Sequence, residues 1–258
     1  MSQSSQNSGA QACAIILAAG VGRRLASSHQ GPKCLLQIGG KTVLQRLLEG
    51  LQHNGITDVS ITVGHEQAAI RAEVARLGFD GVSFVENARY REGSLVSLWT
   101  QRDRLNAGAP VVLMDADVLC DERMIARLGV EGHENRLLLD REIEPGDEPV
   151  KICMRGDVIV DFRKIPEHAH DRFGESVGFF RFSGSMAALL WARCEAYMHG
   201  GAQDGRVMVE YEEAIRDLIL AHPARFGVVE VSDLPWTEID FEEDVARARK
   251  DILPELIA

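Results

Sequence analysis

The amino-acid sequence predicts an α/β fold in which a doubly wound, mainly parallel sheet carries a small antiparallel addition. Short apolar or β-branched runs recur along the first half of the chain, and segments with helical periodicity lie between the earlier runs. Such alternation is typical of parallel strands joined by crossover helices. In the later part of the chain the connections between runs are short or contain glycine, which favours antiparallel pairing.

The main sheet is predicted from five runs, and its crossover helices from two amphipathic segments. Residues 42–54 and 66–77 each place their aliphatic side chains on one helical stripe, as a helix that covers a sheet requires. The five predicted strands are residues 13–18, 59–63, 82–85, 111–114 and 136–139.

The second half predicts the antiparallel addition and the remaining helices. Residues 150–154, 158–162 and 177–182 are expected to form antiparallel strands that could cover a substrate. Further helices are predicted at 185–198, 209–221 and 241–252, with a strand at 226–231 between the last two. Because no repeat or linker divides the chain, we expect one domain over residues 13–258, preceded by a disordered Ser/Gln-rich tail over residues 1–12.

Composition narrows the class of partner. The formal net charge of -11 would repel nucleic acid and anionic lipid surfaces, so neither polymer nor membrane is expected as a partner. No apolar run approaches the roughly 18 residues of a membrane span. The five cysteines are odd in number and dispersed, and the N-terminal segment lacks the pattern of a secretory signal. The sequence therefore predicts a cytoplasmic protein without disulfides or a zinc site.

A glycine-containing loop follows the first predicted strand, in the sequence I-I-L-A-A-G-V-G-R-R-L over residues 15–25. Small residues let the backbone approach a ligand and present N–H groups to phosphate oxygens. The loop is neither a P-loop nor a dinucleotide fingerprint, because Arg23 stands where the latter needs its third glycine. Alone, the loop could equally be an ordinary turn between a strand and a helix.

Two acidic elements suggest a metal site. The run 111–114 ends directly in Asp115 and Asp117, at the edge where open α/β sheets bind ligands. Glu238 and Asp240 show the same spacing ahead of the last predicted helix. Residues two apart on a strand share a face, and carboxylate oxygens suit Mg²⁺. An alternative for Asp117 is to cap the helix that follows it.

The loop together with Gly31-Pro32-Lys33 resembles the signature of the MobA-like and sugar-nucleotide nucleotidyltransferases, L-A-A-G-x-G-x-R-[LM] followed by P-K. The resemblance implies a Rossmann-like sheet of the nucleotide-diphospho-sugar transferase type. It also implies that Arg24 and Lys33 are catalytic cations that neutralise a triphosphate. The implied triphosphate loop comprises Leu17, Ala18, Ala19, Gly20, Val21 and Gly22, and the implied Mg²⁺ ligands are Asp115, Asp117, Glu238 and Asp240.

Segments 86–90, 93–98, 210–215 and 238–240 narrow the resemblance to bacterial CTP:phosphocholine cytidylyltransferases and relatives that act on 2-aminoethylphosphonate or inositol 1-phosphate. The resemblance places Asn87, Ser94 and Asp115 at the nucleotide. Phosphocholine enzymes tend to have paired asparagines where this chain has Gly93-Ser94, so the acceptor stays open. The residues expected at the acceptor are Lys151, Glu175, Glu210, Tyr211 and Trp236.

Two kinds of acceptor recognition are possible on these residues. A quaternary ammonium would need an aromatic cage, for which Tyr90, Phe179, Tyr211 and Trp236 are available. A primary amine could instead pair with a carboxylate from the run of acidic residues Glu210, Glu212 and Glu213. Lys151 could meet the acceptor phosphate or be an exposed strand lysine.

The sequence thus predicts a Mg²⁺-dependent cytidylyltransferase that transfers CMP from CTP to a small phosphorylated or phosphonate acceptor and releases pyrophosphate. One alternative is a nucleotidyltransferase that uses another nucleoside triphosphate with a sugar 1-phosphate or inositol 1-phosphate. A second is a non-catalytic nucleotide-binding module. A homodimer is possible in each case.

Overall fold

The computed structural model describes residues 11–22, 25, 31–130, 132–143, 148–200 and 206–256. Residues 1–10 of the predicted tail lie outside these ranges, as does Arg24, one of the two predicted catalytic cations. The described residues include all five cysteines, which are free and buried. None of the described helices combines the length and apolar character that a membrane span requires.

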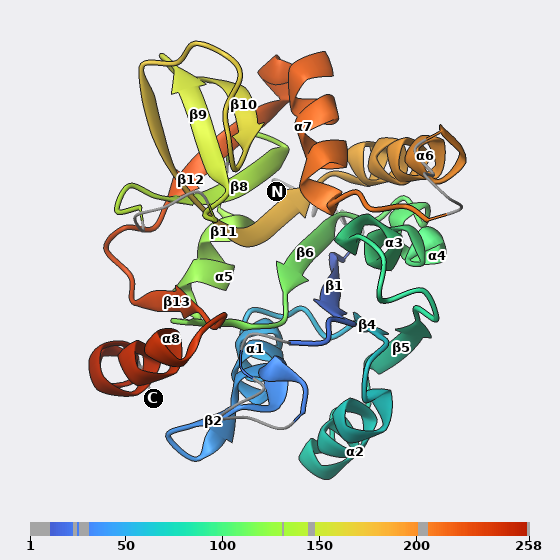
Figure 1. The fold of residues 1–258 in the computed structure, drawn as a ribbon, viewed down its shortest axis with the longest axis vertical. Coiled ribbons are helices and arrows are strands. Elements are labelled where there is room, and N and C mark those ends of the chain that lie inside the picture. Colours follow the sequence, from blue (N-terminus) through green and yellow to red (C-terminus); the bar gives the residue numbers. More distant parts are fainter. Residues whose placement is uncertain are drawn as a thin grey trace, which may run out of the picture.

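A parallel sheet lies at the centre of the molecule, in the strand order β5-β4-β1-β6 (Figure 1). The prediction for this part is confirmed, because the helices α1 and α2 connect its strands. The strands are β1 (Cys13–Ala18), β4 (Val59–Val63), β5 (Val82–Glu86) and β6 (Val111–Asp115), and the helices are α1 (Val43–His53) and α2 (Gln67–Leu77). Because β1 pairs in parallel with both β4 and β6, the carboxyl ends of these strands meet at one edge.

Local signals in the sequence set the ends of both crossover helices. Thr42 precedes α1, and its Oγ1 accepts a hydrogen bond of 3.0 Å from the backbone N–H of Gln45. Helix α2 ends at Gly78, whose φ of 74° is the left-handed conformation that glycine adopts without strain. Helices α1 and α2 each begin and end within one residue of their predicted ranges.

The antiparallel addition is built on β11 (Arg172–Phe182), the longest strand. The first half of β11 pairs with β9 (Lys151–Arg155), and its second half pairs with β6. Its other edge pairs with β8 (Asn135–Asp140). The predicted strand 136–139 therefore lies beside the antiparallel β11, and its parallel neighbour is β12 (Phe226–Glu230). Strand β10 (Val158–Arg163) completes a hairpin with β9, as predicted.

Helices cover both faces of the sheet, and alternation along β1 shows which side chains face each layer. Ile15 packs in a cluster with residues of α3 (Ser94–Trp99), α6 (Gly184–Gly200) and α7 (Tyr211–Ala221). Ala14 and Ile16 point the other way, into a cluster with residues of α1, α2 and α5 (Arg123–Gly129). This two-sided burial is the doubly wound arrangement that the sequence predicts.

Shorter elements complete the fold, and one of them departs from prediction. The predicted helix 241–252 is divided into α8 (Glu242–Arg247) and a π-helical turn over Ala248–Ile252. Pro254 follows, and its ring together with its missing N–H is incompatible with continued helix. The remaining elements are η2 (Lys33–Leu35), β2 (Gln37–Ile38), β3 (Lys41–Thr42), α4 (Arg102–Leu105), β7 (Val118–Cys120), η3 (Pro223–Arg225), β13 (Trp236–Glu238) and η5 (Leu253–Glu255).

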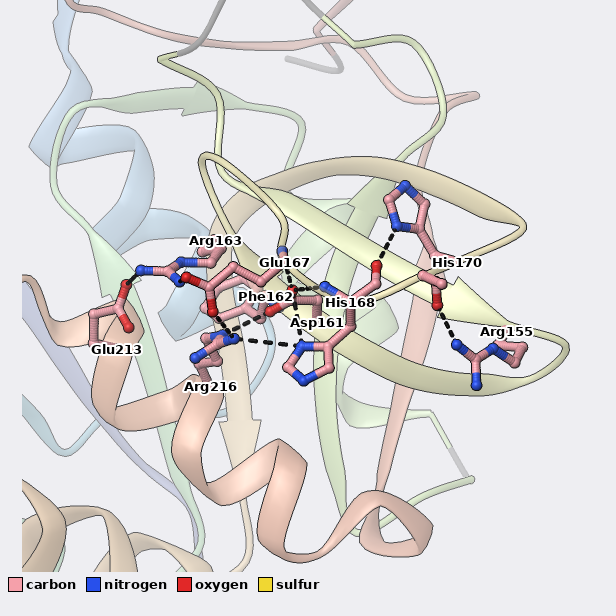
Figure 2. Close-up of polar contacts among 10 residues, drawn as sticks. Arg155, Asp161, Phe162, Arg163, Glu167, His168, His170, Glu213 and Arg216 are labelled. Atoms are coloured by element: carbon pink, nitrogen blue, oxygen red, sulfur yellow. Dashed lines mark hydrogen bonds and ion pairs between the residues drawn. The ribbon is translucent and has the colours of Figure 1, made fainter.

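A buried polar cluster fixes the β9–β10 hairpin to α7 (Figure 2). Asp161 of β10 is fully buried and accepts backbone hydrogen bonds from Glu167 at 2.7 Å and His168 at 2.9 Å. The same carboxylate accepts a bond of 2.6 Å from Nε of Arg216, which belongs to α7. Burial alone would raise the pKa of Asp161, but these hydrogen bonds hold it well below its usual range. The hairpin and α7 are therefore joined by a charge-assisted network.

Candidate active site

The glycine loop and Lys33 form one wall of a cavity of about 340 Å³ at the carboxyl edge of the parallel strands. Gly22 has a φ of +62°, and a Cβ there would lie 3.0 Å from Cγ of Lys33. The lysine stem therefore runs directly against the loop. We call this the loop cavity; its wall includes Leu17, Ala18, Ala19, Gly20, Gly22, Lys33, Ser94, Asp115 and Asp117, whereas Val21 lies outside it.

Lys33 lies between two of the predicted metal ligands. Its Nζ is 3.2 Å from Oδ2 of Asp117 and forms a second ion pair with Oδ1 of Asp240. Burial alone would lower the pKa of Lys33, but the two carboxylates raise it above its usual value. The lysine therefore remains charged, with its stem against the glycine loop.

Three carboxylates converge beside Lys33 because two distant strands pair. Strand β13 pairs antiparallel with β7, and this pairing sets Glu238 opposite Val118. The backbone N–H of Ile239 also donates to the carbonyl oxygen of Asp117 at 3.0 Å. Oxygen atoms from Asp117, Glu238 and Asp240 consequently lie within 4.8 Å of one another. Three of the four predicted metal ligands thus form one group.

The chemistry of this group fits a hard divalent cation. Burial, together with the charges of Asp117 and Asp240, raises the pKa of Glu238 well above its usual range. Lys33 offsets part of the charge of Asp117 and Asp240, yet the pKa of Glu238 stays raised, and a bound divalent cation would favour its ionised form. Carboxylate oxygens are ligands that Mg²⁺ prefers, and the ion commonly completes its octahedron with water and substrate phosphate. The residues present are therefore chemically suited to Mg²⁺.

Asp115, the fourth predicted ligand, has a different immediate partner. The hydroxyl group of Tyr211 donates to its Oδ2 over 2.6 Å. The carboxylate also lies against Gly178 of β11, where a Cβ would come within 2.4 Å of the same oxygen. Burial and the nearby Asp117 and Glu212 raise the pKa of Asp115 well above its usual range. Asp115 thus links the strand end to α7.

Asn87 and Ser94, both predicted to contact the nucleotide, differ in where they lie relative to the loop cavity. Asn87 is buried and is absent from the wall of the loop cavity. Its Nδ2 donates to Oγ of Ser97 at 3.0 Å, and its Oδ1 accepts the N–H of Arg89 at 2.8 Å. Ser94 does line the cavity, where its Oγ accepts the N–H of Tyr211 at 2.9 Å. The hydrogen bonds of Asn87 therefore stabilise the segment between β5 and α3, and its side chain does not line the cavity.

A second cavity, of about 450 Å³, adjoins the first. The two share Asp115, Tyr211, Glu212 and Glu238 on their walls, so the cavities lie side by side. We call it the acidic cavity, because ten carboxylate residues line it against two cations, Lys164 and Arg247. The ten are Asp115, Asp140, Glu142, Glu148, Glu175, Glu212, Glu238, Asp240, Glu243 and Asp244.

Glu175 and Trp236, both predicted at the acceptor, lie on the wall of the acidic cavity. Glu175 stands opposite Asp140 in the β11–β8 register, and burial together with Asp140 raises its pKa to about 7. Trp236 donates from Nε1 to Oδ2 of Asp140 over 2.7 Å. Asp140 was not predicted, although it ends an apolar strand as Asp115 does, and that signal could have identified it.

The other predicted acceptor residues divide between the two cavities and the surface. Tyr211 lines both cavities, while Glu210 lines only the loop cavity and accepts the backbone N–H of Ser94 at 3.0 Å. Lys151 is absent from the wall of the acidic cavity, and its Nζ donates to the carbonyl oxygen of Lys164 at 2.8 Å. Lys164 is the lysine on the wall, and nothing in the local sequence distinguished it from Lys151.

Known proteins resemble this chain in sequence and in structure. The profile of the MobA-like NTP transferase domain matches residues 14–172. The chain is 27% identical over 248 residues to CMP-5'-(3-aminopropyl)phosphonate synthase of Streptomyces rubellomurinus, covering 91% of this chain and 38% of that protein. It is 21% identical over 248 residues to CTP:phosphoglutamine cytidylyltransferase of Campylobacter jejuni, covering 90% of this chain and 97% of that protein.

The likeness extends to solved structures. The structure of CTP:phosphocholine cytidylyltransferase from Streptococcus pneumoniae superimposes with a TM-score of 0.70 at 20% identity, covering 93% of this chain and 98% of that chain. This similarity establishes a shared fold. The chain spans 38% of the length of the Streptomyces relative and about half the length of two further curated relatives. Since the family profile matches well over half of the sequence, the chain belongs to the MobA-like NTP transferase family.

Proposed function

We propose that the protein is a Mg²⁺-dependent cytidylyltransferase, which transfers CMP from CTP to a small phosphorylated or phosphonate acceptor and releases pyrophosphate. The observation that carries the proposal is the pair of adjoining cavities, which share Asp115, Tyr211, Glu212 and Glu238. The loop cavity suits the triphosphate, because the small residues of the glycine loop and the cation Lys33 line it. The acidic cavity suits an acceptor with a cationic end.

The proposed reaction is an in-line displacement at the α-phosphorus of CTP. An anionic oxygen of the acceptor attacks that phosphorus, and a new oxygen–phosphorus bond forms. The bond from the same phosphorus to the oxygen that bridges to the β-phosphate breaks, and its electron pair leaves with pyrophosphate. Because the attacking oxygen is already anionic near neutral pH, the enzyme needs no strong general base.

Charge neutralisation and alignment are the work of the protein in this mechanism. Lys33, held between Asp117 and Asp240 against the loop, is positioned to stabilise negative charge on the phosphate oxygens. When bound by Asp117, Glu238 and Asp240, Mg²⁺ supplies further neutralisation of the reacting phosphate. Arg24 is proposed to add a planar donor group, although it lies outside the described residues.

The choice of CTP and of this acceptor class is supported by the named activities of two relatives. One is a CMP-5'-(3-aminopropyl)phosphonate synthase, and the other is a CTP:phosphoglutamine cytidylyltransferase. Both names combine a cytidine nucleotide with an acceptor that carries phosphorus and nitrogen. The ten carboxylates on the wall of the acidic cavity favour a cationic nitrogen over a neutral sugar.

Pyrophosphate release tests the proposal. The purified protein is assayed with Mg²⁺ and each of CTP, UTP, ATP and GTP, paired in turn with phosphocholine, 2-aminoethylphosphonate, inositol 1-phosphate and glucose 1-phosphate. We expect turnover with CTP and an amino-alcohol phosphate or phosphonate. Turnover confined to glucose 1-phosphate with another triphosphate would assign the protein to a different reaction. Nucleotide binding without turnover would favour a non-catalytic role.

Lys33→Ala provides the matched test of the site. Removing this cation should lower kcat by about 100-fold to 1,000-fold, the usual cost of losing one preorganised group that stabilises a transition state. The control is Lys41→Ala, because Lys41 is 43% exposed and pairs with Glu49, away from both cavities. Equal activity of the two variants would remove Lys33 from the mechanism.

A further inference from the structure

One carboxylate residue on the wall of the acidic cavity has a buried oxygen that lacks a hydrogen bond. Oε2 of Glu212 is buried and has no hydrogen-bond partner among the residues that the structure describes. Glu212 lies on the walls of both cavities, at their junction. A buried acceptor atom without a donor costs free energy, so such atoms are rare in folded proteins unless an ordered water or a ligand supplies the donor.

The two acidic neighbours of Glu212 are already used by the fold. Glu210 accepts the backbone N–H of Ser94 at 3.0 Å, and Glu213 pairs with Arg163 at 3.1 Å. Neither residue lies on the wall of the acidic cavity. Of these three carboxylates near the start of α7, Glu212 alone reaches that cavity, and it is the one with an unsatisfied oxygen.

The aromatic side chains of the same cavity are poorly placed for a cage around a quaternary ammonium. Tyr211 is 4% exposed and Trp236 is 6% exposed, and their polar atoms bond to Asp115 and Asp140. Phe180 is buried, and Phe179, another cage candidate, is absent from the wall. Among the aromatic residues described on this wall, only Phe241 is exposed. A cage needs several open ring faces around one cation.

We propose that the acidic cavity selects an acceptor whose ammonium group carries N–H bonds, with Glu212 as its hydrogen-bond acceptor, and discriminates against a trimethylammonium group. A primary ammonium has three N–H donors, whereas a trimethylammonium group has none. Only the former can satisfy Oε2 of Glu212. Asp140, which stands opposite Glu175 in the β11–β8 register on the same wall, adds negative charge for the cation. The inference rests on the proposed function and names its acceptor class.

Two matched pairs of acceptors test the inference on the wild-type protein. Phosphoethanolamine is compared with phosphocholine, and 2-aminoethylphosphonate with its N,N,N-trimethyl analogue, each with CTP and Mg²⁺. We expect kcat/KM to favour the primary amine by at least about tenfold in both pairs, as a charge-assisted hydrogen bond would give. Equal or better use of the quaternary acceptors would overturn the inference and leave the proposed function standing.

Glu212→Gln assigns the selectivity to this residue. The variant should raise KM for the primary amine about tenfold, and the ratio between the two acceptors should approach one. Glu213→Gln is the control, because the Glu213 carboxylate pairs with Arg163 and does not line the acidic cavity. In this variant the ratio of kcat/KM between the two acceptors should match that of the wild type. An unchanged ratio in Glu212→Gln would overturn the assignment. If the variant does not fold, the wild-type ratio decides, and absence of turnover with every acceptor would overturn both proposals.

Discussion

Gly178 shows how one residue shapes the junction of the two cavities. Its φ of +78° is a conformation that L side chains rarely adopt, and a Cβ would lie 2.4 Å from Oδ2 of Asp115. We predict that Gly178→Ala displaces Asp115 and lowers kcat/KM by about tenfold or more, because small displacements of positioning groups are costly in catalysis. Steady-state kinetics with CTP measures the loss.

Gly156→Ala is the control that separates the effect of backbone strain from the effect of contacting Asp115. Gly156 also has a positive φ, of +57°, but a Cβ there meets nothing within 4 Å. This control should lose about 1 kcal/mol of stability through strain while keeping its kcat/KM. The role assigned to Gly178 fails if the two variants have the same kcat/KM.

Glu175 should make the protein less stable as pH rises. Burial and Asp140 raise its pKa from 4.5 to about 7, so between these values the folded state holds a proton that the unfolded state has released. The free energy of unfolding therefore falls as pH increases through this window. Glu175→Gln should remove this component, making the variant more stable than the wild type at pH 8 by about 1 kcal/mol after allowance for solvent screening.

Urea denaturation at several pH values between about 5 and 8 measures the effect of Glu175, since the linked change in stability falls within this range. The control variant is Glu86→Gln, which removes one carboxylate at an exposed position on β5. Parallel stability curves for the wild type and Glu175→Gln would show that Glu175 titrates normally in the folded state.

Asp161 is the most deeply buried of the side chains that attach the β9–β10 hairpin to α7, and Arg163 adds a more exposed ion pair with Glu213. Asp161 is fully buried and binds Arg216, whose side chain is 11% exposed (Figure 2). We predict that Asp161→Asn destabilises the protein by about 3 kcal/mol at pH 7, because the largely buried Arg216 would keep only the exposed Glu167 as an ion-pair partner. Denaturant unfolding followed by circular dichroism provides the measurement.

Asp157→Asn is the control on the same hairpin. Asp157 is fully exposed and pairs with Arg172 at 3.1 Å, so its loss should leave the stability of the protein essentially unchanged. The low pKa of Asp161 also predicts that its stabilisation is present at neutral pH and is lost as pH falls below its ordinary value of 3.8. A wild type and Asp161→Asn variant with equal stability at pH 7 would contradict this account.

The elements that sequence alone identified are those with local signals. Helices α1 and α2 show their apolar stripes and their caps within about a dozen residues, and β1 shows its apolar run before the glycine loop. The two-residue spacing of Glu238 and Asp240 was visible in the same way. These features required no knowledge of which strands are neighbours.

At the scale of the whole molecule, the features that the sequence did not predict are those that depend on pairing between strands far apart in the chain. Strand β11 inserts between β6 and β8, and β7 pairs with β13 from more than 100 residues away. The acidic cavity joins Asp140 of β8, Glu175 of β11 and Glu212 of α7 through these pairings. Register between distant strands depends on the packing of both faces, which no local pattern specifies. The spacing of the carboxylates and the resemblance predicted the metal ligands, but the cavity wall emerged only from the fold.

Phosphorus-31 NMR of a complete reaction tests the central claim most directly. The protein is incubated with CTP, Mg²⁺ and 2-aminoethylphosphonate, and the spectrum is followed over time. We predict that the CTP resonances give way to pyrophosphate and to two mutually coupled signals from a phosphonate–phosphate anhydride, and that Lys33→Ala does not form this product at a comparable rate. Unchanged CTP, or hydrolysis to CMP without the coupled pair, would contradict transfer of CMP to this acceptor class.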